Sequence, residues 1–232
     1  MDPRYKTVTD YVVRRFTDHL GDRLQSVFVK GSVARGDCVW GVSDIDLVLA
    51  FDRPDQSDNA LKREIEAEAT RFPAGDSLVI QRIGDDRLRQ MSAGTRAYWL
   101  YSCRYDTELL YGTQPDHFLP EPPKGIELAK LIAPLIHADG AVELGKDRLE
   151  RRESRHLAKR MLHALALPAI AGGKLEYVPP LEVANLDFPV RLRSHMDAIL
   201  TAYSQAPVIT DTEPLSRAWR DCWAYIGDFG II

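Results

Sequence analysis

The sequence predicts an α+β protein in which a small mixed sheet flanked by helices is followed by a helical bundle. In the first half of the 232 residues, short apolar runs alternate with helical periodicity. After a proline-rich stretch at residues 113–124, the periodicity is helical. Because each layer must bury its apolar face, the first pattern favours a sheet covered by helices and the second favours a bundle. We therefore predict two domains, residues 1–114 and residues 115–232.

Composition and charge narrow the class of protein. With 45% hydrophobic and 28% charged residues, the chain has the makeup of a soluble globular protein. The net charge of −4 gives no overall basic signal for nucleic acid, although a local basic patch remains compatible with it. Three widely spaced cysteines argue against a disulfide framework or a zinc site and favour a reducing compartment. Since no apolar run is long enough for a membrane span or a signal region, we expect a cytoplasmic protein without a membrane partner.

Two amphipathic helices are predicted in the first domain, over Tyr5–Leu20 and Asn59–Phe72. In each, apolar residues recur three or four positions apart, with charged residues between them. Gly21 ends the first helix and Pro73 ends the second. The apolar faces expected to cover the sheet consist of Val8, Tyr11, Val12, Phe16 and Leu20 in the first helix and Leu61, Ile65, Ala69 and Phe72 in the second.

Two predicted strands between these helices frame a glycine turn. The apolar run Val27–Val29 is followed by Gly31-Ser32, and a second apolar run occupies Leu47–Phe51. Short runs rich in β-branched and aromatic residues next to glycine are typical of buried strands. A third strand is predicted over Asp76–Gln81, after the break that ends the second helix.

Two acids, Asp44 and Asp46, stand at the start of the second strand. Side chains alternate along a strand, so both carboxylates are expected on the same side. Two carboxylates held close together repel each other, and a divalent cation removes that repulsion. Hard oxygen ligands at this spacing suit Mg²⁺, which usually keeps water and substrate phosphate as its other ligands.

Gly31 and Ser32 supply groups that can hold phosphate. Glycine lets the backbone bend, and the turn offers main-chain N–H groups and one hydroxyl to phosphate oxygens. A lone Asp-x-Asp is usually a solvated strand end, and a lone Gly-Ser is usually a turn. Found in this order between two apolar runs, the two motifs are more specific. They predict a site for Mg²⁺ and a nucleoside triphosphate.

The chain here resembles the nucleotidyltransferase superfamily, which includes DNA polymerase beta and the aminoglycoside nucleotidyltransferases. The matching residues are Gly31-Ser32, Ala34-Arg35-Gly36 and Ser43–Leu47. An apolar-Tyr-Gly segment at Thr107–Gly112 is similar to the end of such domains and extends the resemblance over roughly the first half of the chain. The resemblance implies a nucleotidyltransferase fold for the first domain. It also implies an adenylyltransferase-like enzyme that uses Mg²⁺ with ATP or another nucleoside triphosphate.

The resemblance further implies a third carboxylate from a later strand, which serves as general base or metal ligand. Asp76 is the candidate, because Asp76–Ile80 is similar to the acid and strand of streptomycin-type adenylyltransferases. The alternative is a turn aspartate after Gly75. Arg35 also has two interpretations, since it can contact phosphate or pair with Asp37 or a strand-end acid.

The second domain is predicted to be a bundle of four helical regions at residues 125–138, 143–171, 188–205 and 213–227. Its main basic patch is Arg151–Arg160. The resemblance implies that this domain contributes a cation to the triphosphate, with Lys159 first and Arg160 second. The alternative is an exposed charged helix face, on which Glu150 and Glu153 pair with these cations.

The predicted activity is transfer of a nucleoside monophosphate, foremost AMP from ATP, to a hydroxyl group. In size and domain order the chain resembles small antibiotic-modifying adenylyltransferases. A small molecule of the aminoglycoside type is therefore the first acceptor class, with antibiotic resistance as the expected role. Two alternatives stay open. One is a toxin–antitoxin-type enzyme that modifies tRNA or a protein; the other is a nucleotide-binding regulator without turnover, which is favoured if Asp76 is outside the site. The sequence leaves the oligomeric state open.

Overall fold

The computed structural model describes residues 2–51, 57–83 and 85–232. The chain divides into two compact units, and α5 (Ala93–Tyr105) contributes to both. The first unit contains a mixed sheet with helices and the second is mostly helical, so the predicted α+β class is confirmed. The units comprise Met1–Ser92 with Trp99–Glu121, and Ala93–Tyr98 with Pro122–Ile232.

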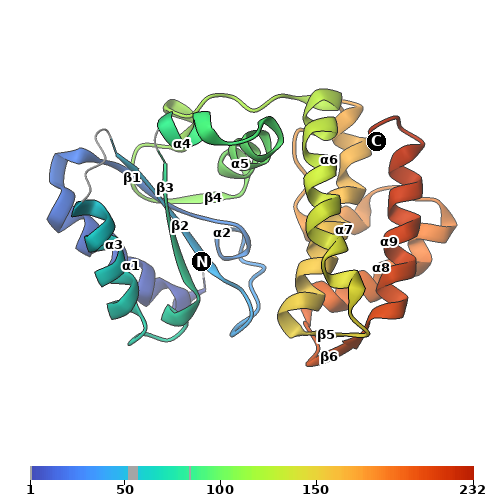
Figure 1. Cartoon of the computed structure of the whole chain (residues 1–232), viewed down its shortest axis with the longest axis horizontal. Coiled ribbons are helices and arrows are strands. Elements are labelled where there is room, and N and C mark those ends of the chain that lie inside the picture. The colour runs from blue at the N-terminus through green and yellow to red at the C-terminus, as the bar shows by residue number, and fades with distance from the viewer. Residues whose placement is uncertain (1, 52–56, 84) are drawn as a thin grey trace. The chain divides into compact units, whose positions relative to one another are not determined.

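The sheet of the first unit has the strand order β3-β2-β1-β4 (Figure 1). Its strands are β1 (Leu24–Lys30), β2 (Ile45–Phe51), β3 (Leu78–Ile83) and β4 (Thr107–Gly112). β1 runs antiparallel to β2 and to β4, whereas β2 and β3 are parallel. The register pairs Asp46 with Lys30 on one side and with Val79 on the other. Asp46 therefore lies on a central strand, near its N-terminal end.

One face of the sheet is covered by α1 (Pro3–Leu20) and α3 (Ser57–Ala69) (Figure 1). Asp2 caps α1, because its side chain accepts a hydrogen bond of 2.9 Å from the N–H of Arg4. The two predicted helices are present, with their apolar stripes turned to the sheet. The core on this face includes Tyr5, Val8, Val12, Phe16, Val27, Val29, Ile45, Leu47, Leu49, Leu61, Ile65 and Ile80.

The opposite face packs against α4 (Asp85–Gln90) and the C-terminal part of α5. Strand residues that alternate with those of the first core point to this side, as period-two geometry requires. On this face the polar residues Lys30 and Asp46 are paired near the N-terminal end of β2. The core here consists of Phe28, Val48, Ala50, Ile83, Leu88, Trp99, Leu100 and Cys103.

The third strand begins at Leu78, so the prediction that it starts at Asp76 is wrong. Gly75–Ser77 instead form the 3₁₀ turn η2, which follows a left-handed Ala74 with φ of 62°. The N–H and hydroxyl of Ser77 both donate to the carbonyl of Ala74, at 3.1 and 2.8 Å. These local hydrogen bonds hold the segment in a turn rather than in the sheet.

The second unit is a bundle built around the largely buried helix α7 (Arg151–Ala171). The helices packed against it are α6 (Gly125–Ala141), α8 (Val190–Ser204) and α9 (Thr212–Gly227). The proline-containing turn η5 (Pro180–Asn185) joins α7 to α8, and η3 (Pro115–His117) lies in the proline-rich stretch before α6. The predicted helical bundle is thus confirmed.

The helical region predicted to be continuous over residues 143–171 is interrupted. The turn η4 (Glu143–Gly145) is followed by β5 (Arg148–Glu150), which pairs antiparallel with β6 (Ile209–Asp211). Helix α7 starts only at Arg151, because Glu150 and Glu153 form a capping box. Glu153 Oε2 accepts the N–H of Glu150 at 2.8 Å, which satisfies a group that would otherwise lack a helical partner.

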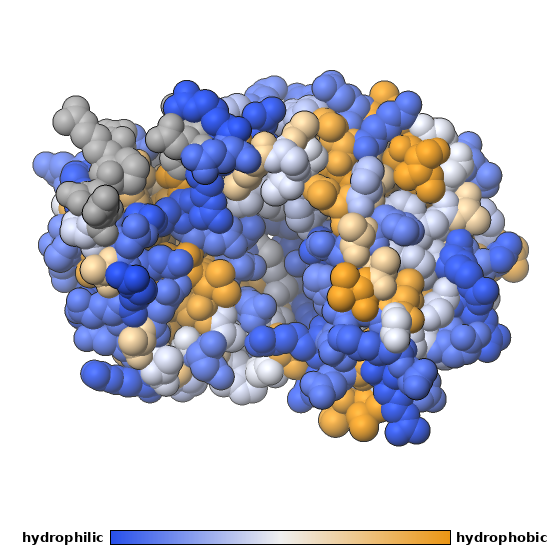
Figure 2. Space-filling model, viewed as in Figure 1, coloured by the Kyte–Doolittle hydropathy of each residue, from blue (hydrophilic) through white to orange (hydrophobic). Residues whose placement is uncertain are grey.

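The visible surface is mainly hydrophilic, with several separate hydrophobic patches (Figure 2). Exposed apolar side chains scattered in this way are ordinary for a globular protein. Across the described ranges, each helix is too short or too polar to cross a bilayer.

Candidate functional site

Asp44 and Asp46 lie at the start of β2 on either side of Ile45. Ile45 is fully buried in the core with α1 and α3, whereas Val48 is fully buried on the opposite face. The alternation of β2 therefore places Asp46 on the face of Val48, and its continuation by two residues places Asp44 on the same side. Both acids are partly exposed. A buried isoleucine that points away thus separates two carboxylates that are open to solvent.

Gly31 turns the chain beside Asp46. Its backbone angles, φ 78° and ψ −146°, lie in a region that glycine adopts and side chains disfavour. A Cβ at this position would lie 3.7 Å from Asp46 Oδ2, so the bend and the carboxylate are neighbours. The N–H of Gly31 donates to the carbonyl of Asp106 at 2.8 Å. This bond fixes the bend to the residue before β4.

Ser32 follows the bend and starts α2 (Ser32–Arg35), a single helical turn. The N–H of Arg35 donates to the carbonyl of Gly31 at 3.1 Å. N–H groups ahead of that bond have no partner within a helix. The main-chain N–H groups of Ser32 and Val33 and the Ser32 hydroxyl are therefore the candidate phosphate contacts at this turn.

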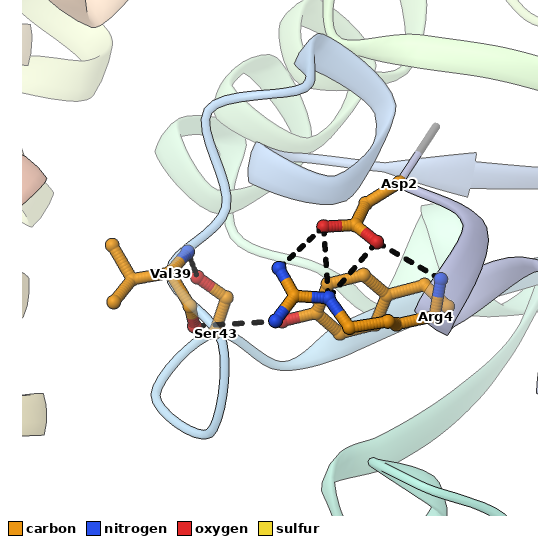
Figure 3. A network of polar contacts seen from close by, with 5 residues as sticks. Asp2, Arg4, Val39 and Ser43 are labelled. Carbon is orange, nitrogen blue, oxygen red and sulfur yellow. Dashed lines mark hydrogen bonds and ion pairs between the residues drawn. The ribbon is translucent and has the colours of Figure 1, made fainter.

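The loop between α2 and β2 is closed by hydrogen bonds around Val39 (Figure 3). The N–H of Val39 donates to Ser43 Oγ at 2.8 Å, and the carbonyl of Val39 accepts from the N–H of Ser43 at 2.9 Å. The Tyr5 hydroxyl of α1 also donates to that carbonyl, at 3.4 Å. Ser43 is buried and directly precedes Asp44. The loop is therefore anchored to α1 and delivers the first acid at a fixed point.

Arg35 lies in two ion pairs with little exposure to solvent. Its Nε is 3.2 Å from Asp37 Oδ2, and its Nη1 is 2.8 Å from Asp106 Oδ2. The structure thus shows the pairing with Asp37 that was the alternative to a phosphate contact. Since Asp106 also accepts the N–H of Gly31 through its carbonyl, these bonds tie the bend and α2 to one residue. A contact between Arg35 and phosphate stays a prediction.

Asp76 is exposed and lies in η2, ahead of β3. The β3 positions on the Asp46 face are Val79, directly across from Asp46, and Gln81, two residues further along. Neither is an acid. Within residues 2–51, 57–83 and 85–232, no group of three His, Cys, Asp or Glu side chains is arranged to hold a metal ion. The role of Asp76 as the third carboxylate therefore stays a prediction.

Three side chains on the Asp46 face, Lys30, Gln81 and Trp99, were missed by the sequence reasoning. Lys30 Nζ lies 5.7 Å from the centroid of a Trp99 ring. Gln81 Nε2 donates to Asp46 Oδ1 at 3.4 Å, and Gln81 Oε1 accepts from Trp99 Nε1 at 3.2 Å. Strand alternation places Lys30 and Gln81 opposite their apolar neighbours, but the register that brings them to the side of Asp46 comes from the structure.

Cys103 lies on the same face of the sheet, in the core with Trp99. Burial raises the pKa of its thiol to about 12, although the nearby charge of Lys30 acts in the opposite direction. The thiol therefore stays protonated at neutral pH. Because thiolates are the form that attacks substrates and binds metals, Cys103 is a packing residue here.

In the second unit, Lys159 lies on the partly exposed face of α7 together with His156 and Arg160. Arg160 Nη1 donates to the Tyr98 hydroxyl at 2.8 Å, and Arg160 Nη2 pairs with Asp139 at 2.7 Å. Burial and the charges of Arg160 and Lys159 lower the pKa of His156. The cationic side chains of this face are therefore Lys159 and Arg160, and Asp139 offsets the charge of Arg160. The contact of Lys159 with a triphosphate stays a prediction.

Residues 11–85 match the family model of the nucleotidyltransferase domain. The matched span contains the Gly31 bend, both acids of β2 and Asp76. A comparison with curated proteins gave no sequence match.

A solved structure of an adenyltransferase shows the same fold. Spectinomycin adenyltransferase AAD(9) from Enterococcus faecialis aligns with a TM-score of 0.59 and 14% identity, over 97% of this chain and 98% of that chain. At this identity the likeness shows the fold. A chain from the complex of a tri-AMPylated HEPN toxin of Shewanella oneidensis with the MNT antitoxin aligns with a TM-score of 0.31 and 17% identity, over 59% of this chain and 90% of that chain. A TM-score this low does not establish a shared fold.

The domain match and the fold lead to the same assignment. The matched residues supply β1, the bend, β2 and β3, which form the part of the sheet that holds the two acids. The fold likeness extends this agreement through the helical unit. The predicted nucleotidyltransferase assignment is thereby confirmed for the domain at residues 11–85, which matches the nucleotidyltransferase domain family.

Proposed function

We propose that the protein transfers AMP from ATP to a hydroxyl group of a small molecule, with Mg²⁺ as cofactor. The proposal is based mainly on one observation, that a Cβ at Gly31 would lie 3.7 Å from Asp46 Oδ2. A bend suited to phosphate is thus next to a carboxylate suited to a cation. Positioning of phosphate and stabilisation of its charge are the main contributions that a protein makes to this class of reaction.

The donor set of the site fits Mg²⁺. Asp44 and Asp46 offer hard oxygen ligands, and Mg²⁺ usually takes one or two protein carboxylates and fills its shell with water and phosphate oxygens. The missing side chain at Gly31 leaves space beside Asp46 for such a phosphate. When bound by Asp44 and Asp46, Mg²⁺ would polarise the phosphate oxygens and offset the charge of the leaving pyrophosphate.

The chain's own residues bind and orient the reactants. Main-chain N–H groups at Ser32 and Val33 donate to the phosphate oxygens. The acceptor oxygen forms a bond to the α-phosphorus while the bond from that phosphorus to the pyrophosphate oxygen breaks. Asp76 is our candidate for the base that takes the acceptor proton. Lys159 is our candidate for the cation that meets the pyrophosphate.

An aminoglycoside-type antibiotic is the acceptor class that we put first. The supporting comparison is the fold likeness, over nearly the full length of both chains, to a spectinomycin adenyltransferase whose structure holds ATP and spectinomycin. The net charge of −4 is compatible with a cationic acceptor. Antibiotic resistance and a cytoplasmic location follow from this proposal as expected properties.

The test is label transfer from ATP carrying ³²P at the α-phosphate. The purified protein is incubated with Mg²⁺ and either a panel of aminocyclitol and aminoglycoside antibiotics or a cell extract, and products are separated by size. Label on an antibiotic, with equimolar pyrophosphate, supports the proposal. Label on RNA or protein supports the macromolecular alternative instead. Asp44→Ala should abolish transfer while the far-UV circular dichroism spectrum is unchanged, and retained turnover in that variant would contradict the metal assignment.

A nucleotide-binding regulator without turnover is the second candidate function. The observation that favours it is the absence of an acid at Val79 and Gln81, the two β3 positions on the Asp46 face. In that case Mg²⁺·ATP binds but no acceptor receives label. Equilibrium dialysis with labelled ATP, run beside the transfer assay, separates this outcome from a failure to bind nucleotide.

A further inference from the structure

We propose that Gln81, oriented by Trp99, is a positioning residue that holds one oxygen of the Asp46 carboxylate and so presents the other to the cation. The inference rests on the proposed function of the site. It concerns a residue that carries no charge and lies on β3, where a third acid was expected. The argument depends on three hydrogen-bonding side chains that come from three different elements.

The contacts fix which way the Gln81 amide points. The Trp99 indole N–H can only donate, so the group that faces it at 3.2 Å must be the amide oxygen Oε1. The amide NH₂ then faces Asp46 Oδ1 at 3.4 Å, and an ionised carboxylate can only accept. A flipped amide would set an oxygen against the carboxylate and an NH₂ against the indole. Both neighbours therefore select the same orientation.

The core holds the Trp99 side chain that orients the Gln81 amide. It is 7% exposed and packs with Phe28, Val48 and Cys103 in the core between the sheet and α5. A nearly buried indole N–H requires an acceptor, and Gln81 Oε1 supplies it. The position of the amide is thus set by the core rather than by solvent.

The two oxygens of Asp46 face different groups. Oδ1 accepts from Gln81, and Oδ2 lies 3.7 Å from where a Gly31 Cβ would be. Because Gln81 holds Oδ1, rotation of the carboxylate plane away from this orientation is disfavoured. Oδ2 is then the oxygen presented on the side of the phosphate-binding bend. Residues that orient a metal ligand in this way typically change metal affinity by about 10–100-fold when they are removed.

A glutamine suits this position better than an acid of the same length. A carboxylate at residue 81 would repel Asp46 and lacks a proton to donate. If Gln81 instead acted as a metal ligand or as a substitute for the third acid, Gln81→Glu would keep or strengthen cation binding. The positioning role predicts the opposite.

The experiment measures Mn²⁺ binding in the presence of a non-hydrolysable ATP analogue, by the electron paramagnetic resonance signal of free Mn²⁺. Gln81→Leu and Gln81→Glu should each weaken Mn²⁺ affinity about 10-fold. Trp99→Phe should weaken it less, because the amide stays but is no longer oriented. Gln90→Leu, at an exposed site at the end of α4, is the matched control and should bind as wild type does. Thermal unfolding shows whether each variant is folded.

Two further measurements distinguish positioning from a structural role. In the ¹⁵N spectrum the indole resonance of Trp99, assigned by its loss in Trp99→Phe, should shift when Gln81 is replaced by leucine. Excess Mg²⁺ should restore transfer by Gln81→Leu, since ligand orientation is impaired while both carboxylates remain. It should fail to restore Asp46→Ala. Wild-type Mn²⁺ affinity in Gln81→Leu, or tighter binding in Gln81→Glu, overturns the positioning role alone. No Mn²⁺ binding by the wild-type protein overturns the proposed function as well.

Discussion

At the scale of single residues, Gly31 has two separable properties, its backbone conformation and its lack of a side chain. The first prediction separates them with a second glycine. Gly31 and Gly21 have similar angles, φ 78° and ψ −146° against φ 51° and ψ −131°. A Cβ at Gly21 would meet no atom within 4 Å, whereas one at Gly31 would face Asp46. Both alanine variants should lose stability by about 1–3 kcal/mol from backbone strain.

Only Gly31→Ala should also weaken ATP binding, because its methyl group occupies the space beside Asp46. The measurement pairs urea unfolding with equilibrium dialysis of labelled ATP for the two variants. Equal nucleotide affinity in Gly31→Ala and Gly21→Ala would show that phosphate does not lie on this bend.

Single residues also show which parts of the site could be predicted from the sequence and which could not. Asp44 and Asp46 were identifiable because they follow Gly31-Ser32 in order between two apolar runs, a combination more specific than either motif alone. The sequence did not identify Gln81 as a site residue, because an uncharged polar residue in a strand does not by itself indicate a catalytic or binding role. Its place depends on the register between β2 and β3 and on Trp99, which is distant in sequence. Such a role follows from tertiary contacts alone.

At the scale of elements, the loop that leads into β2 should control the first acid. Ser43→Ala removes the acceptor of the Val39 N–H in a buried turn, which should cost about 1–3 kcal/mol. It should also loosen Asp44 and weaken Mn²⁺ binding. Ser154→Ala removes another buried serine, whose hydroxyl donates to the carbonyl of Arg151 in α7. Thermal unfolding and Mn²⁺ titration of both variants test this, and an equal effect on the metal would refute it.

Two helices of the second unit, α8 and α9, are joined by an ion pair that predicts a pH dependence. Arg191 of α8 pairs with Asp221 of α9, and His195 Nε2 lies 2.8 Å from the same carboxylate. Chiefly through Arg191, these contacts hold the pKa of Asp221 below its usual value. Since the folded pKa is the lower one, the stabilisation is complete above the unfolded pKa of about 3.9 and is lost as pH falls through the folded pKa.

Asp221→Asn should therefore be less stable than wild type at pH 6, by about 1 kcal/mol or less because Arg191 is largely exposed. The difference should shrink below about pH 4. Urea unfolding followed by tryptophan fluorescence measures it, since Trp219 and Trp223 lie on α9. Asp211→Asn, whose carboxylate is exposed and 3.8 Å from Arg148, serves as control. A difference that persists unchanged at pH 3 would exclude the ion pair as its cause.

Element boundaries show where sequence periodicity is insufficient. The predicted third strand starts at Asp76, yet the hydrogen bonds of Ser77 to Ala74 keep that part in a turn. Likewise, helical spacing extends through residues 143–171, but the capping box at Glu150 and Glu153 starts α7 late. In both cases a few local hydrogen bonds override a pattern that spans many residues.

At the scale of the whole molecule, the two units are not separated at one point of the chain, because α5 is divided between them. The boundary predicted from the proline-rich stretch is a single cut after residue 114. In the structure, Ala93–Tyr98 belongs to the second unit although it precedes that cut. Gly94 approaches α6 so closely that a Cβ there would lie 2.6 Å from the carbonyl oxygen of Leu131. Tyr98 accepts from Arg160 of α7 at 2.8 Å.

The helical unit should consequently need this segment to reach its full stability. Fragment 93–232 contains it, whereas fragment 122–232 lacks it and exposes the α6 and α7 surfaces that contact Gly94 and Tyr98. We expect the shorter fragment to unfold at a lower temperature in circular dichroism. Fragment 106–232 is the matched control, because it restores length without α5 and should resemble 122–232. Equal melting of all three would mean that one cut after the sheet separates the two parts, as the sequence alone suggests.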